Sequence, residues 1–158
     1  MVDAGVRIWI ETSHHPAFRC GGWAWVREQA GERAGAAGGD RYVTAGRTAL
    51  TALAAALKGL PTDAAATIHT ADPSLLAAAL VLGGQAKPDE PPTEDLDVWA
   101  PILTAAKGRR LTFARTTAAN PPAVFAAAWA ELVRDKAKAG GTFAAAIPKP
   151  NLAKIAGL

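Results

Sequence analysis

The chain has 158 residues, a formal net charge of +3, and 50% hydrophobic and 20% charged residues, which is ordinary for one globular domain with a hydrophobic core. It contains no run of about 18 apolar residues, and its first residues do not resemble a secretory leader, so we expect a cytoplasmic protein without membrane contact. The single cysteine, Cys20, excludes an internal disulfide and a cysteine-based metal cluster. The weak positive charge permits nucleic-acid binding without requiring it.

Two strands joined by a polar loop are expected first. Apolar residues alternate over residues 6–10, which predicts a β-strand that ends at the carboxylate of Glu11. A loop with His14 and His15 follows. Gly21-Gly22 then opens a second strand, in which tryptophans alternate with smaller apolar residues.

A third strand and the first helix come next. Several glycines predict a turn and a broken strand over residues 28–39, with a second piece at residues 41–43. Thr44 is a good N-cap, and leucines recur at helical spacing behind it, which predicts a helix over residues 45–60. Gly59 favours the end of this helix.

The middle of the chain predicts a strand, a helix and a linker. Residues 65–70 form a short apolar run that ends two residues before Asp72. A helix separates this strand from the earlier ones, so we expect it to pair parallel with one of them. Residues 74–82 predict a second helix, and the proline-rich acidic residues 85–93 predict an irregular linker.

The last third of the chain predicts a helix, a strand, a long helix and a tail. Residues 94–107 carry an apolar stripe at helical spacing, and residues 109–116 alternate as a fifth strand. Asn120 is the expected N-cap of a helix that ends at Gly140-Gly141. We therefore expect one domain over residues 1–139 and a tail over residues 140–158.

The tail is too apolar for a simple disordered end, and its Pro148-Lys149-Pro150 sequence favours an extended segment. It either packs back onto its own domain or docks on a protein partner. Its candidate partner-binding residues are Phe143, Ile147, Leu152, Ile155 and Leu158.

Several local sequences, in their order along the chain, resemble one known family. The sequences GGWAWV, TIHTAD, LDVWAPILTAA and WAEL are similar to parts of the type 1 ribonuclease H family, and the likeness covers residues 5–138. The resemblance implies an α/β fold with a mixed five-stranded sheet. Three antiparallel strands are followed by two parallel strands, and helices cover both faces.

The resemblance also implies where a catalytic site would lie. Family members hold two magnesium ions with four carboxylates, so that one ion activates water and the other stabilises the leaving oxygen. The matching positions here are Glu11, Ala49, Asp72 and Ala130, so only Glu11 and Asp72 remain as candidate catalytic and metal-binding residues. The loop before the last helix also lacks the family's histidine. Such a degenerate site would bind no metal, or one Mg2+ or Mn2+ ion weakly.

Histidines offer a different metal chemistry. His14 and His15, close to Glu11 and Asp72 in the family's geometry, could form a transition-metal site of imidazole and carboxylate ligands. The simpler interpretation is a polar loop at a strand end. His69 alternates with apolar residues, so we expect a partly buried histidine rather than a ligand.

Nucleic-acid contacts are expected from a few residues only. Thr44 matches a phosphate-binding threonine of the family, although threonine is also an ordinary N-cap. Arg109, Arg110 and Arg115 make the predicted fifth strand cationic, and they either contact nucleic acid or protect a solvated edge.

We interpret the chain as a ribonuclease H-like pseudoenzyme, a non-catalytic module that binds nucleic acid (an RNA–DNA hybrid or a duplex), a protein partner through its tail, or both. Two alternatives stay open. The first is an active or weakly active metal-dependent ribonuclease H that cleaves the RNA of RNA–DNA hybrids at Glu11 and Asp72. The second is a pure protein-interaction adaptor, which the acidic linker favours.

Overall fold

The computed structural model describes residues 5–60, 64–82, 94–107, 109–117, 119–156 and 158. The linker expected at residues 85–93 lies outside them. Within the described residues, no helix is long and apolar enough to cross a membrane. The elements, in chain order, are β1 (Val6–His15), β2 (Cys20–Gln29), β3 (Glu32–Arg41), α1 (Ala45–Lys58), β4 (Ala66–Thr70), α2 (Pro73–Leu82), α3 (Leu96–Ala106), β5 (Leu111–Arg115), α4 (Pro121–Gly140), β6 (Phe143–Ala146) and α5 (Lys149–Leu152).

The strands form one sheet in the order β5-β4-β1-β2-β3-β6. β1, β2 and β3 pair antiparallel as a meander, whereas β4 pairs parallel with β1 and β5 pairs parallel with β4. The predicted mixed sheet is therefore confirmed. The expected count of five strands is corrected to six, because β6 from the tail pairs antiparallel with β3. β3 is also one continuous strand rather than two pieces.

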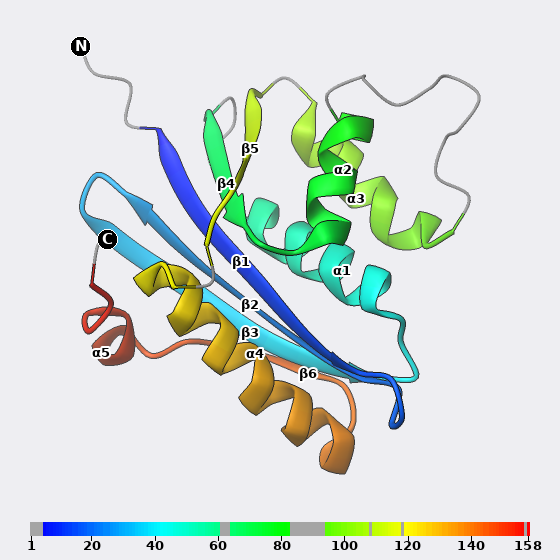
Figure 1. The fold of residues 1–158 in the computed structure, drawn as a ribbon. Coiled ribbons are helices and arrows are strands. Elements are labelled where there is room, and N and C mark those ends of the chain that lie inside the picture. Colours follow the sequence, from blue (N-terminus) through cyan, green and yellow to red (C-terminus); the bar gives the residue numbers. More distant parts are fainter. Residues whose placement is uncertain (1–4, 61–63, 83–93, 108, 118, 157) are drawn as a thin grey trace.

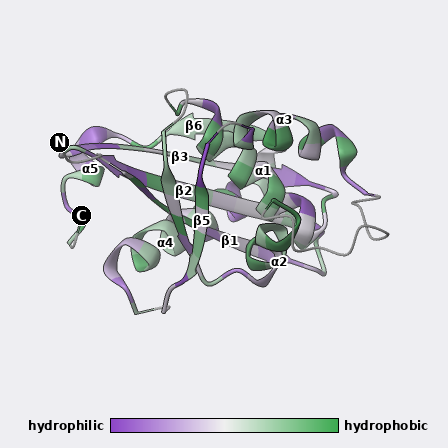
Figure 2. Ribbon diagram, turned by 90° about the horizontal axis from the view of Figure 1, so that it is seen from above, coloured by the Kyte–Doolittle hydropathy of each residue, from purple (hydrophilic) through white to green (hydrophobic). Residues whose placement is uncertain are grey.

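Helices cover the two faces of the sheet unequally. Figure 1 shows α1, α2 and α3 on one face and α4 crossing the other, which confirms the prediction of helices on both faces. A larger apolar cluster lies under α1, where Trp23, Trp25 and Trp99 pack with leucines and isoleucines. The sequence of α2 is apolar on every side, as its green colour in Figure 2 shows.

The second apolar cluster lies between α4 and the sheet, and small residues let the helix approach closely. Trp9, Ala126, Ala130 and Val133 belong to this cluster. Gly22 of β2 has no room for a side chain, because a Cβ atom there would overlap the carbonyl oxygen of Ala130 and the backbone of α4. In the glycine pair predicted to open the second strand, Gly22 is thus the place where the long helix docks, whereas a Cβ atom at Gly21 would overlap Thr48 of α1.

The tail packs on its own domain, which is one of the two arrangements that the sequence left open. Ile147, Leu152 and Ile155 are buried in the cluster beneath α4, and Phe143 and Leu158 pack against it partly buried. These were the candidate partner-binding side chains. Contact with a partner through them would require the tail to leave the domain.

Backbone contacts hold the same tail in place. Arg33 of β3 donates hydrogen bonds to the carbonyl oxygens of Leu152 (2.8 Å), Ile155 (3.2 Å) and Leu158 (3.1 Å). The expected extended conformation around residues 148–150 is corrected, since Lys149 begins the short helix α5. The apolar residues of the tail therefore continue the domain's core and its sheet.

Candidate functional site

Glu11 and Asp72 lie together where β1 and β4 diverge. Trp9 belongs to the cluster under α4, so the alternation of the strand places Glu11 on that same face. The Thr70 hydroxyl donates a hydrogen bond to the carbonyl oxygen of Ile10 at 2.8 Å, which fixes the end of β4 against β1. The Ala71 amide then donates to Glu11 Oε2 at 3.1 Å. The prediction that the strand ends at Glu11 and is followed by a loop with His14 and His15 is corrected: β1 continues to His15, because its pairing with β2 extends to Cys20.

Glu11 is buried and its charge is poorly compensated. Its side chain is 9% exposed. Burial raises the pKa of Glu11 to about 7, the nearby Asp72 carboxylate adds to this rise, and the hydrogen bond from Ala71 opposes it. The buried position therefore favours the protonated, uncharged form of Glu11.

Asp72 uses its carboxylate to begin a helix. Asp72 Oδ1 accepts hydrogen bonds from the amides of Ser74 (2.8 Å) and Leu75 (3.3 Å) in the first turn of α2. Asp72 Oδ2 accepts a hydrogen bond from the Thr12 hydroxyl on β1. Both oxygens therefore have protein donors, and the residue serves as an N-cap and as a clamp between β1 and α2.

Ala49 and Ala130 occupy the two positions at which the resemblance implies further carboxylates. Both are fully buried. Ala49 belongs to the cluster under α1 and Ala130 to the cluster under α4, so they lie on opposite faces of the sheet. Among the described residues, no group of three or more histidine, cysteine, aspartate or glutamate side chains could hold a metal ion.

The histidines do not gather around the carboxylates. His14 Nε2 lies 2.7 Å from the carbonyl oxygen of Val43, and the His15 ring packs edge-on against Phe18 with centroids 4.7 Å apart. His69 stacks on Trp9 at 4.8 Å with an interplanar angle of 17°. It is partly buried, as predicted, and burial lowers its pKa. These contacts favour the structural interpretation of all three side chains.

The candidate nucleic-acid residues are placed at two separate locations. Thr44 is the N-cap of α1, and its hydroxyl oxygen accepts a hydrogen bond from the Arg47 amide at 3.0 Å. Arg109 turns back onto α3 and donates to the carbonyl oxygen of Ala105 at 2.7 Å. Arg110 and Arg115 are exposed on either side of β5. Of the three arginines, only these two therefore present exposed positive charge.

A surface that the sequence did not reveal lies at the far end of the β1–β2 hairpin. It consists of two exposed aromatic rings and three exposed cationic side chains, and we call it the hairpin-end surface: Phe18, Arg19, Arg41, Tyr42 and Lys138. The backbone brings its parts together, because Cys20 pairs with Arg41 across β2 and β3. In addition, the Val43 amide donates a hydrogen bond to the carbonyl oxygen of Arg19 at 3.2 Å.

Each ring of the hairpin-end surface carries a cation on one face. Lys138 Nζ, from the end of α4, lies 3.4 Å from the centroid of Phe18. The guanidinium carbon of Arg41 lies 5.2 Å from the centroid of Tyr42. Phe18 is 51% exposed and Tyr42 is 75% exposed, and Tyr42 is the chain's single tyrosine. The sequence signal was an aromatic residue beside an arginine at two places, residues 18–19 in a predicted loop and residues 41–42 in the predicted second piece of the third strand.

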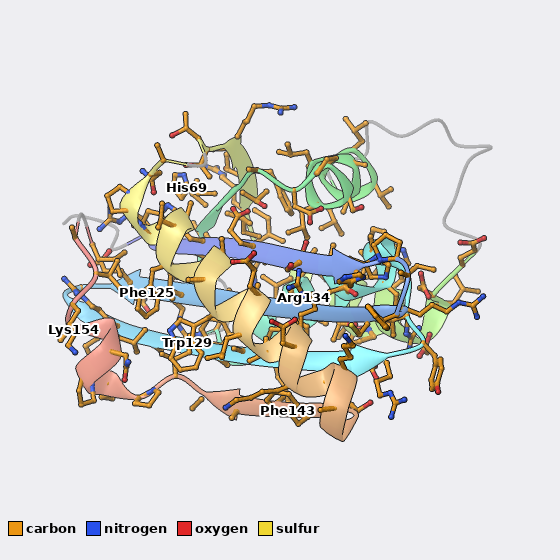
Figure 3. The ribbon with its side chains drawn as sticks, turned by 60° about the horizontal axis from the view of Figure 1, so that its bottom comes forward. His69, Phe125, Trp129, Arg134, Phe143 and Lys154 are labelled. Atoms are coloured by element: carbon orange, nitrogen blue, oxygen red, sulfur yellow. The ribbon has the colours of Figure 1, made fainter. Side chains whose placement is uncertain are left out.

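Figure 3 shows Arg134 on the face of the sheet that α4 covers. Arg134 Nη1 donates to the Ser13 hydroxyl at 2.9 Å, and the same guanidinium forms an ion pair with Asp135 at 3.0 Å. Ser13 follows Glu11 by two residues on β1 and therefore shares its face. A guanidinium thus lies along the strand face where the resemblance would place metal ions.

This sheet, with its strand order and its helices on both faces, is the ribonuclease H fold. No protein-family model matches the chain, and no curated protein matches it. Solved structures do. The N-terminal RNase H domain of Rv2228c from Mycobacterium tuberculosis, solved as a fusion with maltose binding protein, has a TM-score of 0.66 and 17% identity, and the match covers 85% of this chain and 96% of that one.

A second solved structure is also similar to this chain. LC9-RNase H1, described as a type 1 RNase H with the type 2 active-site motif, has a TM-score of 0.62 and 16% identity. The match covers 92% of this chain and 79% of that one. At these identities the likeness establishes the fold that the sequence predicted, and the chemistry has to be argued from the residues present.

Proposed function

We propose that this chain is a non-catalytic, ribonuclease H-like module that binds nucleic acid. The observation that carries the non-catalytic part is the pair of buried alanines, Ala49 and Ala130, at two of the four family carboxylate positions. Of the two carboxylates that remain, Glu11 is buried and accepts a hydrogen bond from the Ala71 amide, and both oxygens of Asp72 accept hydrogen bonds from the protein.

Two-metal hydrolysis asks for more than this site offers. Magnesium prefers several hard, charged oxygen ligands in near-octahedral geometry. Two ions about 4 Å apart repel each other and need several carboxylates to hold them. The chain provides alanine at the other two family positions, and both alanines are buried. The residues present do not fit a two-metal centre.

Nucleic-acid binding is supported by the fold's neighbours and by the hairpin-end surface. Both similar structures are described as RNase H proteins, and the family resemblance implies an RNA–DNA hybrid or a duplex as the ligand. The hairpin-end surface combines three cationic side chains with two exposed rings, the combination that contacts phosphates and bases. Arg110 and Arg115 beside β5 would add a smaller basic surface.

The test uses variants that keep the structural hydrogen bonds. Asp72→Asn retains an oxygen for the amides of Ser74 and Leu75, and Glu11→Gln retains one for Ala71. Purified wild-type protein and both variants are incubated with an RNA–DNA hybrid in Mg2+ and then in Mn2+, and binding of the same hybrid is measured in parallel. We expect binding without cleavage, and equal binding by all three proteins.

Two outcomes would contradict the proposal in different ways. Metal-dependent cleavage by the wild type that is lost in both variants would show an active ribonuclease H that uses Glu11 and Asp72. The absence of binding to any nucleic acid at low salt would leave a protein-interaction adaptor.

A further inference from the structure

We infer that the preferred ligand of the hairpin-end surface is single-stranded nucleic acid rather than a duplex. The inference rests on the proposed function and concerns which form of nucleic acid the module takes. It depends on the geometry of the two exposed rings, Phe18 and Tyr42, and of the cations placed on them.

Both rings are exposed, and each carries a cation on one face. Lys138 covers one face of Phe18 at 3.4 Å, and His15 makes a T-shaped contact with the same ring, with centroids 4.7 Å apart. Arg41 covers one face of Tyr42 and also donates from Nη2 to the Tyr42 hydroxyl at 3.4 Å. A cation on one face holds the ring in place and adds positive charge beside it. With 51% of Phe18 and 75% of Tyr42 exposed, both rings remain accessible to a planar partner.

A nucleobase in a single strand is such a partner, whereas a base in a duplex is not. Duplex bases stack on each other and present only their edges in the grooves. Single-stranded bases have exposed π faces, and proteins bind them with aromatic platforms next to cations that contact the phosphates. The hairpin-end surface has two aromatic platforms and three cations, and they lie near the pair that Cys20 and Arg41 form between β2 and β3.

Exposed aromatic and arginine side chains also occur in protein interfaces. The net charge of the surface therefore decides between nucleic acid and a protein partner. All three charged members of the surface are cationic: Arg19, Arg41 and Lys138. The neighbouring Asp40, whose carboxylate accepts hydrogen bonds from the Arg41 amide (2.9 Å) and from the Thr142 hydroxyl, adds one negative charge against these three positive charges. A polyanion therefore complements this surface better than an ordinary protein surface does.

The experiment compares three labelled ligands by fluorescence anisotropy: an oligothymidylate of about 16 nucleotides, an RNA–DNA hybrid and a DNA duplex of equal length. The wild type is expected to bind the single strand at least about tenfold more tightly than either duplex form. Phe18→Ala and Tyr42→Ala should each weaken single-strand binding by roughly tenfold and leave duplex binding nearly unchanged. Phe18→Tyr and Tyr42→Phe keep the platforms and should retain most of the affinity.

Control variants at other exposed positions show whether a loss of single-strand affinity is specific to the hairpin-end surface. Leu132→Ala removes an exposed apolar side chain from the solvent side of α4, and Lys58→Ala removes an exposed cation at the end of α1, so neither should change binding. Lys138→Ala should reduce the salt dependence of single-strand binding by about one counterion. Because Phe18, Tyr42 and Lys138 are exposed, thermal melts of their variants should match that of the wild type.

The outcomes distinguish this inference from the function on which it rests. Equal affinity for all three ligands, or full single-strand affinity in the Phe18→Ala, Tyr42→Ala double variant, would overturn the inference and leave a nucleic-acid-binding module. Failure to bind any of the three ligands at low salt would overturn both and point to a protein ligand for this surface.

Discussion

Replacing Glu11 by glutamine should make the domain more stable at alkaline pH and change it little at acidic pH. Glutamine has the shape of the protonated glutamate and can still accept the hydrogen bond from the Ala71 amide. It carries no charge at any pH. The difference between variant and wild type therefore measures the cost of ionising a carboxyl group in this buried position.

The sign and size of the effect follow from the pKa of Glu11. The folded state raises it from 4.5 to about 7, so the folded protein holds its proton more tightly than the unfolded chain does. Below pH 4.5 Glu11 is protonated in both the folded and the unfolded state, so it does not change the free energy of unfolding. Between pH 4.5 and 7 the wild type loses stability as pH rises, and above pH 7 the loss is constant. At 1.36 kcal/mol per pKa unit, the full loss is about 3 kcal/mol.

Denaturant unfolding at about pH 4 and about pH 8 gives the required free energies. The Glu11→Gln protein should exceed the wild type by up to about 3 kcal/mol at the higher pH and equal it at the lower pH. Glu131→Gln, at an exposed position on α4, is the control and should give the same small difference at both values. A Glu11→Gln difference that is independent of pH, or a less stable variant at pH 8, would refute the reasoning.

Three further predictions concern the fold. Gly22→Ala should lower the free energy of unfolding by more than about 2 kcal/mol, because its Cβ atom would overlap the backbone of α4, whereas Gly46→Ala in the open first turn of α1 should raise it slightly. Leu152→Ala should cost about 2–5 kcal/mol in chemical unfolding and Leu103→Ala less than about 1, since only Leu152 is buried; equal costs would mean that the tail does not pack. Thr44→Ala should cost about 1 kcal/mol through loss of the cap of α1, and unchanged thermal stability would contradict this role.

The sequence predicted the central elements because their signals are local. Alternation predicted the first half of β1, and Thr44 with the following leucines predicted α1 and its cap. The parallel pairing of β4 with one of the earlier strands, here β1, was also predicted, since a crossover through a helix makes the two strands parallel. The first two predictions use neighbouring residues, and the third uses a general rule of chain topology.

The parts that escaped prediction depend on residues far apart in the chain. The sequence of β6 (Phe143–Ala146) is nearly all alanine, which has little strand preference, and only its pairing with β3 makes it a strand. The glycines of β3 suggested a break, yet they are where other groups approach: a Cβ atom at Gly39 would collide with Ala137 of α4. Local propensity gives no information on such contacts.

The sequence did not predict the hairpin-end surface, for a related reason. Phe18 and Tyr42 are ordinary aromatic residues in the sequence, and only the structure shows that they are exposed. The cation on Phe18 comes from Lys138, in the last turns of α4, a contact that no spacing rule indicates. Exposure and long-range contact decide whether a ring belongs to a core or to a binding surface.

The pairing of β6 with β3 has a consequence for how the chain folds. Ala36 pairs with Ala146, so the outer hydrogen-bonding edge of β3 finds its partner about a hundred residues later in the chain. Until that segment docks, β3 presents an unpaired edge rich in small residues, which is a template for pairing with another molecule. Closing this edge requires a costly long-range loop, so we expect it to be a late event in folding. Aggregation during refolding should therefore originate at β3, and weakening Arg33 or Leu152 should prolong its exposure.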